Sequence, residues 1–209
     1  MIDAKSALKR LQEGNQRFIR GLRSVDSVMT DAKRDKLAGR QEPFAIILGC
    51  SDSRVPAEIV FDQGLGDLFV IRVAGNIVAP SQIGSVEFAA SKFKTRLVVV
   101  LGHSQCGAIC ATVEDLKRPN AEQSLNIKSI VDRIRPSVEP FKMTELWNDD
   151  DALVEEAMRA NVRASANQLR HGSALLENLS EKHDLLIVGA EYSLETGEVV
   201  FFDGLPEQD

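Results

Sequence analysis

Two short segments of the chain carry side chains that could hold a metal ion. They are residues 50–55 (CSDSRV) and residues 103–107 (HSQCG). Two cysteines and one histidine form a three-ligand set that suits zinc and leaves the fourth position open. An open position is typical of a catalytic zinc site rather than a structural one. The pattern therefore predicts a catalytic zinc ion bound by Cys50, His103 and Cys106.

Apolar runs precede both segments and are typical of buried strands in a parallel sheet. Residues 44–49 (FAIILG) lead into Cys50, and residues 97–102 (LVVVLG) lead into His103. Short continuous apolar runs bounded by glycine are the usual pattern of such strands. Ligands of open α/β sheets bind at the carboxyl ends of the strands, so we expect the two thiols and the imidazole to meet there.

A structural role for these cysteines is the alternative, because cysteine is among the residue types most often buried. Cys110 follows Cys106 by four residues on the same helix face, and we expect a small buried side chain rather than a fourth ligand. A thiol redox function for these two cysteines is disfavoured, since their spacing is not Cys-x-x-Cys. His171 and His183 have no partner pattern and are interpreted as surface or packing residues.

Composition favours a soluble intracellular enzyme built as one domain. The chain has 209 residues, and 44% of them are hydrophobic, which can fill a sizeable core. No run approaches the roughly 18 apolar residues of a membrane span, and the first residues lack a signal peptide. Three cysteines do not suggest a secreted disulfide framework, so we expect a cytoplasmic location. The net charge of -6 opposes general nucleic-acid binding.

Alternating strand and helix signals predict the architecture around these segments. Residues 3–40 are expected to form a helical arm in two stretches, too polar for a core element and packed across another surface. The expected strands are residues 44–49, 67–73, 97–102, 184–190 and 199–202, with a turn at 195–197 between the last two and helices near 81–94 and 106–118.

Residues 122–180 are expected to be mainly helical, with breaks near Pro136 and Pro140. The run at residues 148–151 (NDDD) is predicted to cap a helix that begins near Ala152. The predicted fold class is therefore α/β, with a central, mostly parallel β-sheet flanked by helices. An N-terminal helical arm and a C-terminal hairpin strand are expected additions to it.

The two ligand segments resemble the signatures of the β-class carbonic anhydrases. The resemblance is close from about Gln41 to Ala111, and the combined Cys-x-Asp-x-Arg and His-x-x-Cys-Gly pattern is complete. It implies Zn²⁺ ligands at Cys50, His103 and Cys106, a catalytic pair at Asp52 and Arg54 beside the metal, and substrate-binding residues at Gln41, Phe69 and Gly107.

The resemblance also implies an activity and an assembly. The activity is reversible hydration of carbon dioxide to bicarbonate and a proton by zinc-bound hydroxide, since zinc lowers the pKa of bound water toward neutrality. The assembly is a dimer or tetramer of single-domain chains, in which residues 1–40 pack on a partner subunit and residues 41–209 form the zinc-binding core. One alternative is hydrolysis of carbonyl sulfide or carbon disulfide on the same fold. Another is a non-catalytic, zinc-stabilised interaction protein with Asp52 or Cys110 as fourth ligand.

Asp52 and Arg54 are open to two interpretations. A carboxylate two residues beyond a zinc ligand could occupy the fourth position, and the planar fork of Arg54 could instead hold it in a bidentate pair. The alternative is a loop ion pair, which contributes under about 1 kcal/mol if it is exposed. We favour the first interpretation because both residues lie in the ligand loop.

A second, non-catalytic bicarbonate site occurs in some members of the family, built from a tryptophan, an arginine and a tyrosine. Arg72 and Tyr192 align with the last two, whereas Ile47 replaces the tryptophan and Trp147 does not match it. Isoleucine has no N–H to donate to an anion, so we expect bicarbonate to act here mainly as product. Phe88 stands where many members have tyrosine.

Overall fold

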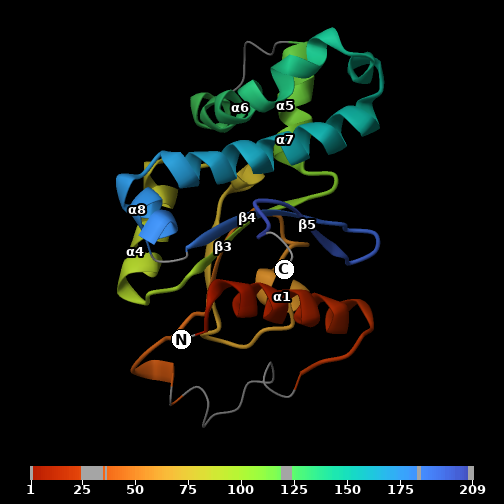
Figure 1. Cartoon of the computed structure of the whole chain (residues 1–209). Coiled ribbons are helices and arrows are strands. Elements are labelled where there is room, and N and C mark those ends of the chain that lie inside the picture. The colour runs from red at the N-terminus through yellow and green to blue at the C-terminus, as the bar shows by residue number, and fades with distance from the viewer. Residues whose placement is uncertain (1, 25–34, 36, 119–123, 183–184, 207–209) are drawn as a thin grey trace.

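A five-stranded sheet forms the centre of the computed structural model (Figure 1). The structure describes residues 2–24, 35, 37–118, 124–182 and 185–206. The strand order is β2-β1-β3-β4-β5, in which the first four strands are parallel and β5 pairs antiparallel with β4. This arrangement confirms the predicted α/β fold with a hairpin strand at one edge. The strands are β1 (Ala45–Gly49), β2 (Leu68–Arg72), β3 (Leu97–His103), β4 (Leu186–Tyr192) and β5 (Val199–Asp203).

Helices cover both faces of this sheet. On one side lie α4 (Pro80–Lys92), α5 (Gly107–Lys117), α6 (Leu125–Val138), α7 (Asp150–His171) and α8 (Ala174–Lys182), and of these α5 and α6 stack on α7 rather than on the strands (Figure 1). The other face is covered by α1 (Ala4–Ile19) and the short α3 (Ala57–Val60). Three 3₁₀ segments complete the described elements: η2 (Ala74–Asn76), η3 (Glu139–Met143) and η4 (Glu145–Asn148). No helix among the described residues is long and apolar enough to cross a membrane.

The central strands are apolar throughout because both of their faces are buried. In β1, Ile46 and Leu48 pack under the five-helix face, whereas Ala45 and Ile47 pack under α1. Every residue of β1 and β3 is buried. A strand that is covered on both sides needs apolar side chains at successive positions, which explains the continuous runs in the sequence.

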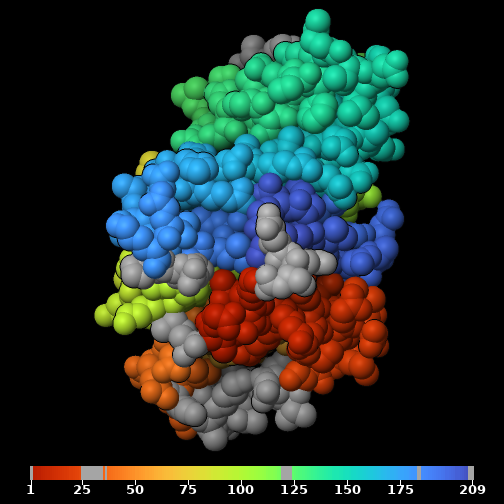
Figure 2. All heavy atoms as spheres, viewed as in Figure 1, coloured from red at the N-terminus to blue at the C-terminus, as the bar shows by residue number. Residues whose placement is uncertain are grey.

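The first helix packs on the core of its own chain, and this corrects the expectation that the stretch is too polar for a core element. Asn15, which is 2% exposed, donates from Nδ2 to the carbonyls of Val60 (3.1 Å) and Gly197 (2.9 Å). Figure 2 shows α1, in red, lying against the body of the molecule. A narrow apolar stripe suffices to bury one helix face even when the remaining positions are charged. That stripe is Ala7, Leu8 and Leu11.

The second helical stretch expected within residues 3–40 is mostly outside the part of the chain that the structure describes. Residues 25–34 and 36, which carry most of the second expected stretch, lie outside the described residues. Packing of residues 1–40 on a partner subunit stays a prediction.

Two element boundaries differ from the expectation. Pro136 lies inside α6, where its ring removes only one hydrogen bond, and the break comes after Val138, with Pro140 in the first turn of η3. The strand expected at residues 184–190 is β4, which runs two residues further because it pairs with β3 as far as His103↔Tyr192. The predicted cap before α7 is confirmed, since the Asp149 side chain accepts from the backbone of Ala152 at 3.1 Å.

At one point in the sheet, two neighbouring strands lead to helices on opposite faces. After β1 the chain passes to α3 on the α1 face, and after β3 it passes to α5 on the opposite face. The strands β1 and β3 are neighbours, so their carboxyl ends diverge to opposite sides of the sheet. Such a topological switch point is where open α/β sheets bind ligands.

Candidate metal centre

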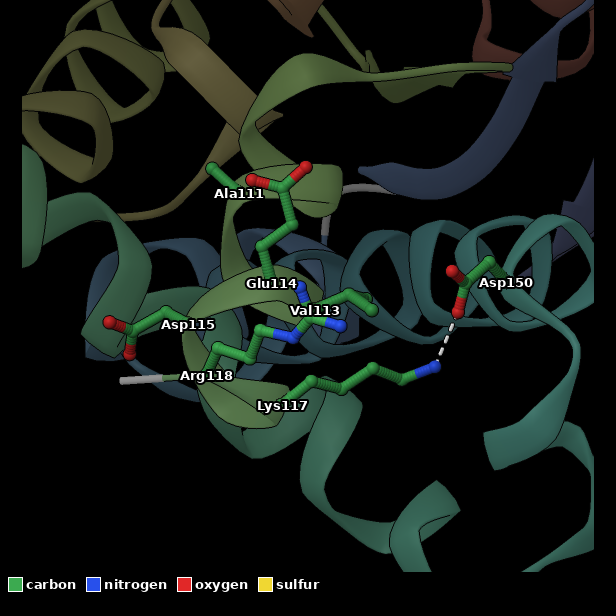
Figure 3. Close-up of a pocket in the computed structure, with 7 residues that line it drawn as sticks. All are labelled: Ala111, Val113, Glu114, Asp115, Lys117, Arg118 and Asp150. Atoms are coloured by element: carbon green, nitrogen blue, oxygen red, sulfur yellow. Dashed lines mark hydrogen bonds and ion pairs between the residues drawn. The ribbon is translucent and has the colours of Figure 1, made fainter. Parts of the chain in front are cut away.

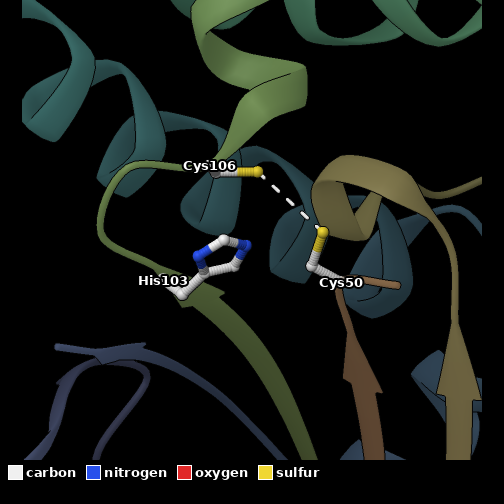
Figure 4. Close-up of side chains that lie close together, drawn as sticks. All are labelled: Cys50, His103 and Cys106. Atoms are coloured by element: carbon white, nitrogen blue, oxygen red, sulfur yellow. Dashed lines mark hydrogen bonds between the residues drawn. The ribbon is translucent and has the colours of Figure 1, made fainter. Parts of the chain in front are cut away.

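Cys50, His103 and Cys106 meet at this switch point (Figure 4). Cys50 directly follows β1, His103 is the last residue of β3, and Cys106 is the N-cap of α5. Their possible ligand atoms all lie within 4.8 Å of one another, and the two sulphur atoms are 4.0 Å apart. All three residues are buried. The structure thus brings together the three residues that the sequence predicts as metal ligands.

The imidazole of His103 is oriented by its own loop. Its Nδ1 lies 2.8 Å from the carbonyl oxygen of Ser104, and a carbonyl can only accept, so Nδ1 carries the proton. The Ser104 backbone is tied in turn to the hairpin, because its N–H donates to the Tyr192 carbonyl at 3.0 Å. The Nε2 atom is buried and has no hydrogen-bond partner among the described residues. Its lone pair therefore points into the cluster unpaired, as a metal ligand requires.

The two thiols lie in contact with each other. The sulphur atoms of Cys50 and Cys106 are 4.0 Å apart, either thiol can be the donor, and this contact lowers the pKa of Cys50, although burial opposes the shift. The same contact, together with burial, raises the pKa of Cys106. The backbone N–H of Gly75 also donates to the Cys50 sulphur, at 3.4 Å. Both contacts shift the pKa of the Cys50 thiol downward.

Asp52 and Arg54 form a two-point pair beside the cluster. Arg54 donates from Nε to Oδ1 at 3.0 Å and from Nη2 to Oδ2 at 2.7 Å. The Arg54 backbone N–H adds a bond to Oδ1 at 2.9 Å. The side-chain hydrogen bonds from Arg54 are the main reason why the pKa of Asp52 lies well below its usual range. Oδ2 of Asp52 is 3.9 Å from the free Nε2 of His103, so the held carboxylate borders the ligand cluster.

Arg72 has a role that the sequence did not indicate. Its Nε donates to the carbonyl of Cys50 at 2.9 Å, and its Nη2 donates to the carbonyl of Asp52 at 2.5 Å. The guanidinium thus holds the backbone of the ligand loop. Ile47, which the resemblance aligns with a tryptophan of some β-class members, is fully buried under α1.

The donor set fits zinc. Tetrahedral zinc with sulphur ligands at about 2.3 Å places two sulphurs roughly 3.8 Å apart, close to the 4.0 Å found here. An orphaned, buried imidazole nitrogen completes the set. Cys110 is not part of the cluster in the described chain, and burial raises the pKa of its thiol. With Asp52 held by Arg54, the cluster offers three protein ligands rather than four.

Comparison with known proteins agrees with the site. A family model described as carbonic anhydrase matches residues 45–199, which include all three cluster residues. Carbonic anhydrase 2 of Mycobacterium tuberculosis is 38% identical over 203 residues, covering 95% of this chain and 92% of the relative. The solved structure of the β-carbonic anhydrase CcaA has a TM-score of 0.73 at 26% identity, covering 94% of this chain and 95% of that chain. The chain belongs to the β-class carbonic anhydrase family.

Two further relatives extend this picture. The carbonic anhydrase of Mycolicibacterium smegmatis is 37% identical over 194 residues, which cover 93% of this chain and 91% of the relative. The β-carbonic anhydrase CafA of Aspergillus fumigatus has a TM-score of 0.75 at 22% identity, covering 97% of this chain and 92% of that chain, and it supports the fold alone.

The expected substrate-binding residues of this β-class chain divide into two groups. Gly107 directly follows Cys106 and lies at the cluster. Phe69, in contrast, pairs with Ile46 near the amino end of β1, four residues before Cys50. At ~3.3 Å per strand residue, Ile46 and the paired Phe69 backbone are roughly 13 Å along the strand from Cys50. Gln41 is exposed and precedes β1, so it lies at the same remote end of the sheet. A single chain does not bring Gln41 and Phe69 to its own cluster.

A separate pocket lies away from the metal centre. It has a volume of about 500 Å³ and contains none of the expected site residues (Figure 3). Lys117 reaches Asp150 across it by an ion pair. Its wall mixes acidic and basic groups and belongs to α5 and the start of α7: Ala111, Val113, Glu114, Asp115, Lys117, Arg118 and Asp150.

Proposed function

We propose that the chain catalyses the reversible hydration of carbon dioxide to bicarbonate at a zinc ion held by Cys50, His103 and Cys106. One observation carries the proposal. Two sulphurs and an unpaired, buried imidazole nitrogen converge at the switch point of a carbonic anhydrase fold. Asp52 is the carboxylate beside the described cluster, and its bond to Arg54 leaves the fourth coordination position of the metal to water.

In this proposal the metal activates the water and the protein orients it. Zinc, when bound, would act as a Lewis acid that makes water a nucleophile near neutral pH. Asp52 is held by two Arg54 nitrogens, and with zinc bound it would accept a hydrogen bond from the attacking water and orient it. Because the pair keeps the pKa of Asp52 low, the carboxylate stays ionised and remains an acceptor through the working pH range.

Arg54 has a second task in this scheme. An unrestrained carboxylate two residues beyond Cys50 could itself reach the metal and exclude substrate water. The fork of Arg54 offers that carboxylate a competing partner with matched geometry. The pair therefore acts as a gate on the fourth position.

The substrate side of the site is proposed to come from a second copy of the chain. Gln41 and Phe69 lie at the other end of the sheet from the cluster of their own chain. A symmetric dimer that places the β1 start of one subunit against the β1 end of its partner would complete the site. Gln41 would then donate to an oxygen of carbon dioxide, and Phe69 would form part of an apolar slot. A dimer or a tetramer satisfies this proposal equally.

A reducing compartment suits the ligand set. All three cysteines are free thiols in the structure, and Cys50 and Cys106 must stay reduced to hold zinc. We therefore propose a cytoplasmic location.

The test compares substrates and metal states on the purified chain. We expect about one zinc per chain, carbon dioxide hydration that is lost with chelator and restored by zinc, and little sulfide release from carbonyl sulfide or carbon disulfide. Cys50→Ala should lose both zinc and hydration activity, whereas Cys110→Ala should keep both. Sulfide release that outpaces hydration would favour the alternative substrate class. Full zinc and full activity in Cys50→Ala would overturn the assignment.

A further inference from the structure

Two polar residues are buried in the middle of α7, on a face that is otherwise apolar. Asn161 is 2% exposed and Ser165 is 4% exposed, and they lie between the buried Met158, Val162 and Ala166. Burying such groups costs free energy unless they form hydrogen bonds. Residues four apart lie on the same side of a helix, so the two side chains point toward the same neighbour.

That neighbour is η2, the short segment that follows β2. Asn161 donates from Nδ2 to the carbonyl of Gly75 at 2.8 Å. Ser165 donates from Oγ to the carbonyl of Asn76 at 3.1 Å. Two successive carbonyls of η2 are therefore held by two successive turns of α7.

The conformation of η2 needs such support. Gly75 has a φ of 68°, and Asn76 has a φ of 43°, which is in the left-handed region and uncommon for a residue with a side chain. A Cβ at Gly75 would lie 2.7 Å from Cδ1 of Ile134 and 3.0 Å from Cβ of Ala108. The backbone of Gly75 is thus pressed against α5 and α6 while α7 holds its carbonyl.

The other side of the same residue faces the metal centre. The N–H of Gly75 donates to the Cys50 sulphur at 3.4 Å, and η2 passes beside that sulphur in Figure 4. The N–H of Gly75 and its carbonyl are groups of one glycine, so a helix that fixes the carbonyl also limits where the N–H can point. A hydrogen bond to a thiolate withdraws charge from the sulphur and tunes the metal that it binds.

We propose that Asn161 is a positioning residue for the metal centre, which holds Gly75 so that its N–H donates to the Cys50 thiolate. Ser165 supports the same segment from the next turn of α7. The inference rests on the proposed zinc function, and it adds that α7 sets the electronic character of one metal ligand. The hydrogen bonds of both side chains go to η2, so they act on the metal centre through Gly75.

Cobalt(II) substitution gives the direct readout, because the thiolate-to-cobalt charge-transfer band reports the charge on sulphur. In Asn161→Ala we expect this band to move to longer wavelength, since a thiolate without its N–H donor holds its electrons less tightly. We also expect zinc affinity, measured by chelator competition, to fall by about 10–100-fold, as for other groups that orient metal ligands. Ser165→Ala should change both readouts in the same direction by less.

Asn15→Ala is the matched control. Asn15 is also 2% exposed and also donates to backbone carbonyls, but it lies in α1, and its hydrogen bonds join it to Val60, Gly197 and Val199. It should lower stability without moving the cobalt band or the zinc affinity. If Asn161→Ala folds and keeps the wild-type band and affinity, the proposal is wrong.

Two other results are equally informative. If Asn161→Ala does not fold, Ser165→Ala decides, and an unchanged band there overturns the proposal. A wild-type chain that binds neither zinc nor cobalt would overturn the proposed function itself. The two failures are therefore distinguishable.

Discussion

The pair between Asp52 and Arg54 is partly open to solvent, with side-chain exposures of 18% and 51%. An exposed ion pair of this kind contributes at most about 1 kcal/mol to stability. Its importance lies in where it keeps the carboxylate, because Oδ2 is 3.9 Å from the unpaired Nε2 of His103. At the residue scale the pair is a positional device, and its loss should affect activity far more than folding.

Arg54→Ala tests this separation. We expect hydration activity to fall by at least about tenfold, a loss typical of a misplaced catalytic group, while zinc content and the unfolding midpoint stay close to wild type. Arg54→Lys keeps the charge but loses the planar fork, so it should recover only part of the activity. Wild-type turnover in Arg54→Ala would show that the pair does not control the site.

At the element scale, the packing of α1 depends on the close approach of Gly14 to the backbone of Phe61. Gly14 packs so tightly that an added Cβ would lie 1.9 Å from the carbonyl oxygen of Phe61. Gly84, which is also inside a helix, has nothing within 4 Å of such a Cβ. A glycine-to-alanine substitution would therefore clash with the backbone in α1 and enter open space in α4.

The two glycines form a matched pair of variants. Gly14→Ala should lower the free energy of unfolding by at least about 1–3 kcal/mol, because a backbone oxygen has little room to move. Gly84→Ala should raise it by roughly 0.5–1 kcal/mol, since alanine loses less entropy than glycine in a helix. Urea unfolding midpoints measure both effects. Equal shifts for the two variants would contradict the packing of α1.

The start of α1 has a pH-dependent cap. Asp3 accepts from the backbone N–H of Ser6 at 2.8 Å and from its hydroxyl at 2.7 Å. The backbone hydrogen bond is the main reason why the pKa of Asp3 lies below its usual value of 3.8. A carboxyl with a lowered pKa in the folded state stabilises the fold above its unfolded-state pKa. That contribution is lost as the pH falls through the folded-state value.

Asp3→Ala and Asp3→Asn distinguish the contribution of the capping hydrogen bond from that of the carboxylate charge. Asp3→Ala should lower the melting temperature relative to wild type at neutral pH, and the difference should shrink as the pH falls below the usual carboxyl value of 3.8. Asparagine also caps helices but does not titrate, so the difference between Asp3→Asn and Asp3→Ala should change little over this range. A wild-type advantage over Asp3→Ala that persists unchanged at the lowest pH would contradict the assignment.

At the scale of the whole molecule, the sheet separates the two halves of the proposed site. The metal cluster lies beyond the carboxyl ends of β1 and β3, whereas Gln41 lies before β1. If a partner supplies Gln41, a defect at Gln41 of one chain and a defect at Cys50 of the other fall in the same site of a mixed dimer. One of the two sites in that dimer is then intact.

Mixed assembly of Gln41→Ala and Cys50→Ala chains should therefore restore activity. Random assortment into two-fold dimers leaves about a quarter of all sites complete. Mixing Cys50→Ala with His103→Ala is the control, because both changes remove a metal ligand and no mixed dimer contains a complete site. Activity in the first mixture that stays at the level of the second would place Gln41 outside the partner's site.

Much of the molecule could be predicted from its sequence. The runs before Cys50 and His103 are apolar at successive positions because both faces of β1 and β3 are buried, and this local pattern sufficed to place the strands. The ligands could be located because parallel strands bring their carboxyl ends together. The cap at Asp149 was equally local, since a cap needs only a side chain and the backbone that follows it.

The tertiary structure alone decided the remaining features. The packing of α1 on its own chain, the hold of Arg72 on two carbonyls of the ligand loop, and the contact of Asn161 with Gly75 join residues far apart in the chain. No local pattern encodes such pairings, because they depend on strand register and on how helices stack on the sheet. The same register places Phe69 beside Ile46 and so away from Cys50. Residue types and short spacings thus determined the chemistry of the centre, whereas long-range packing determined what orients it and which parts of the site one chain holds.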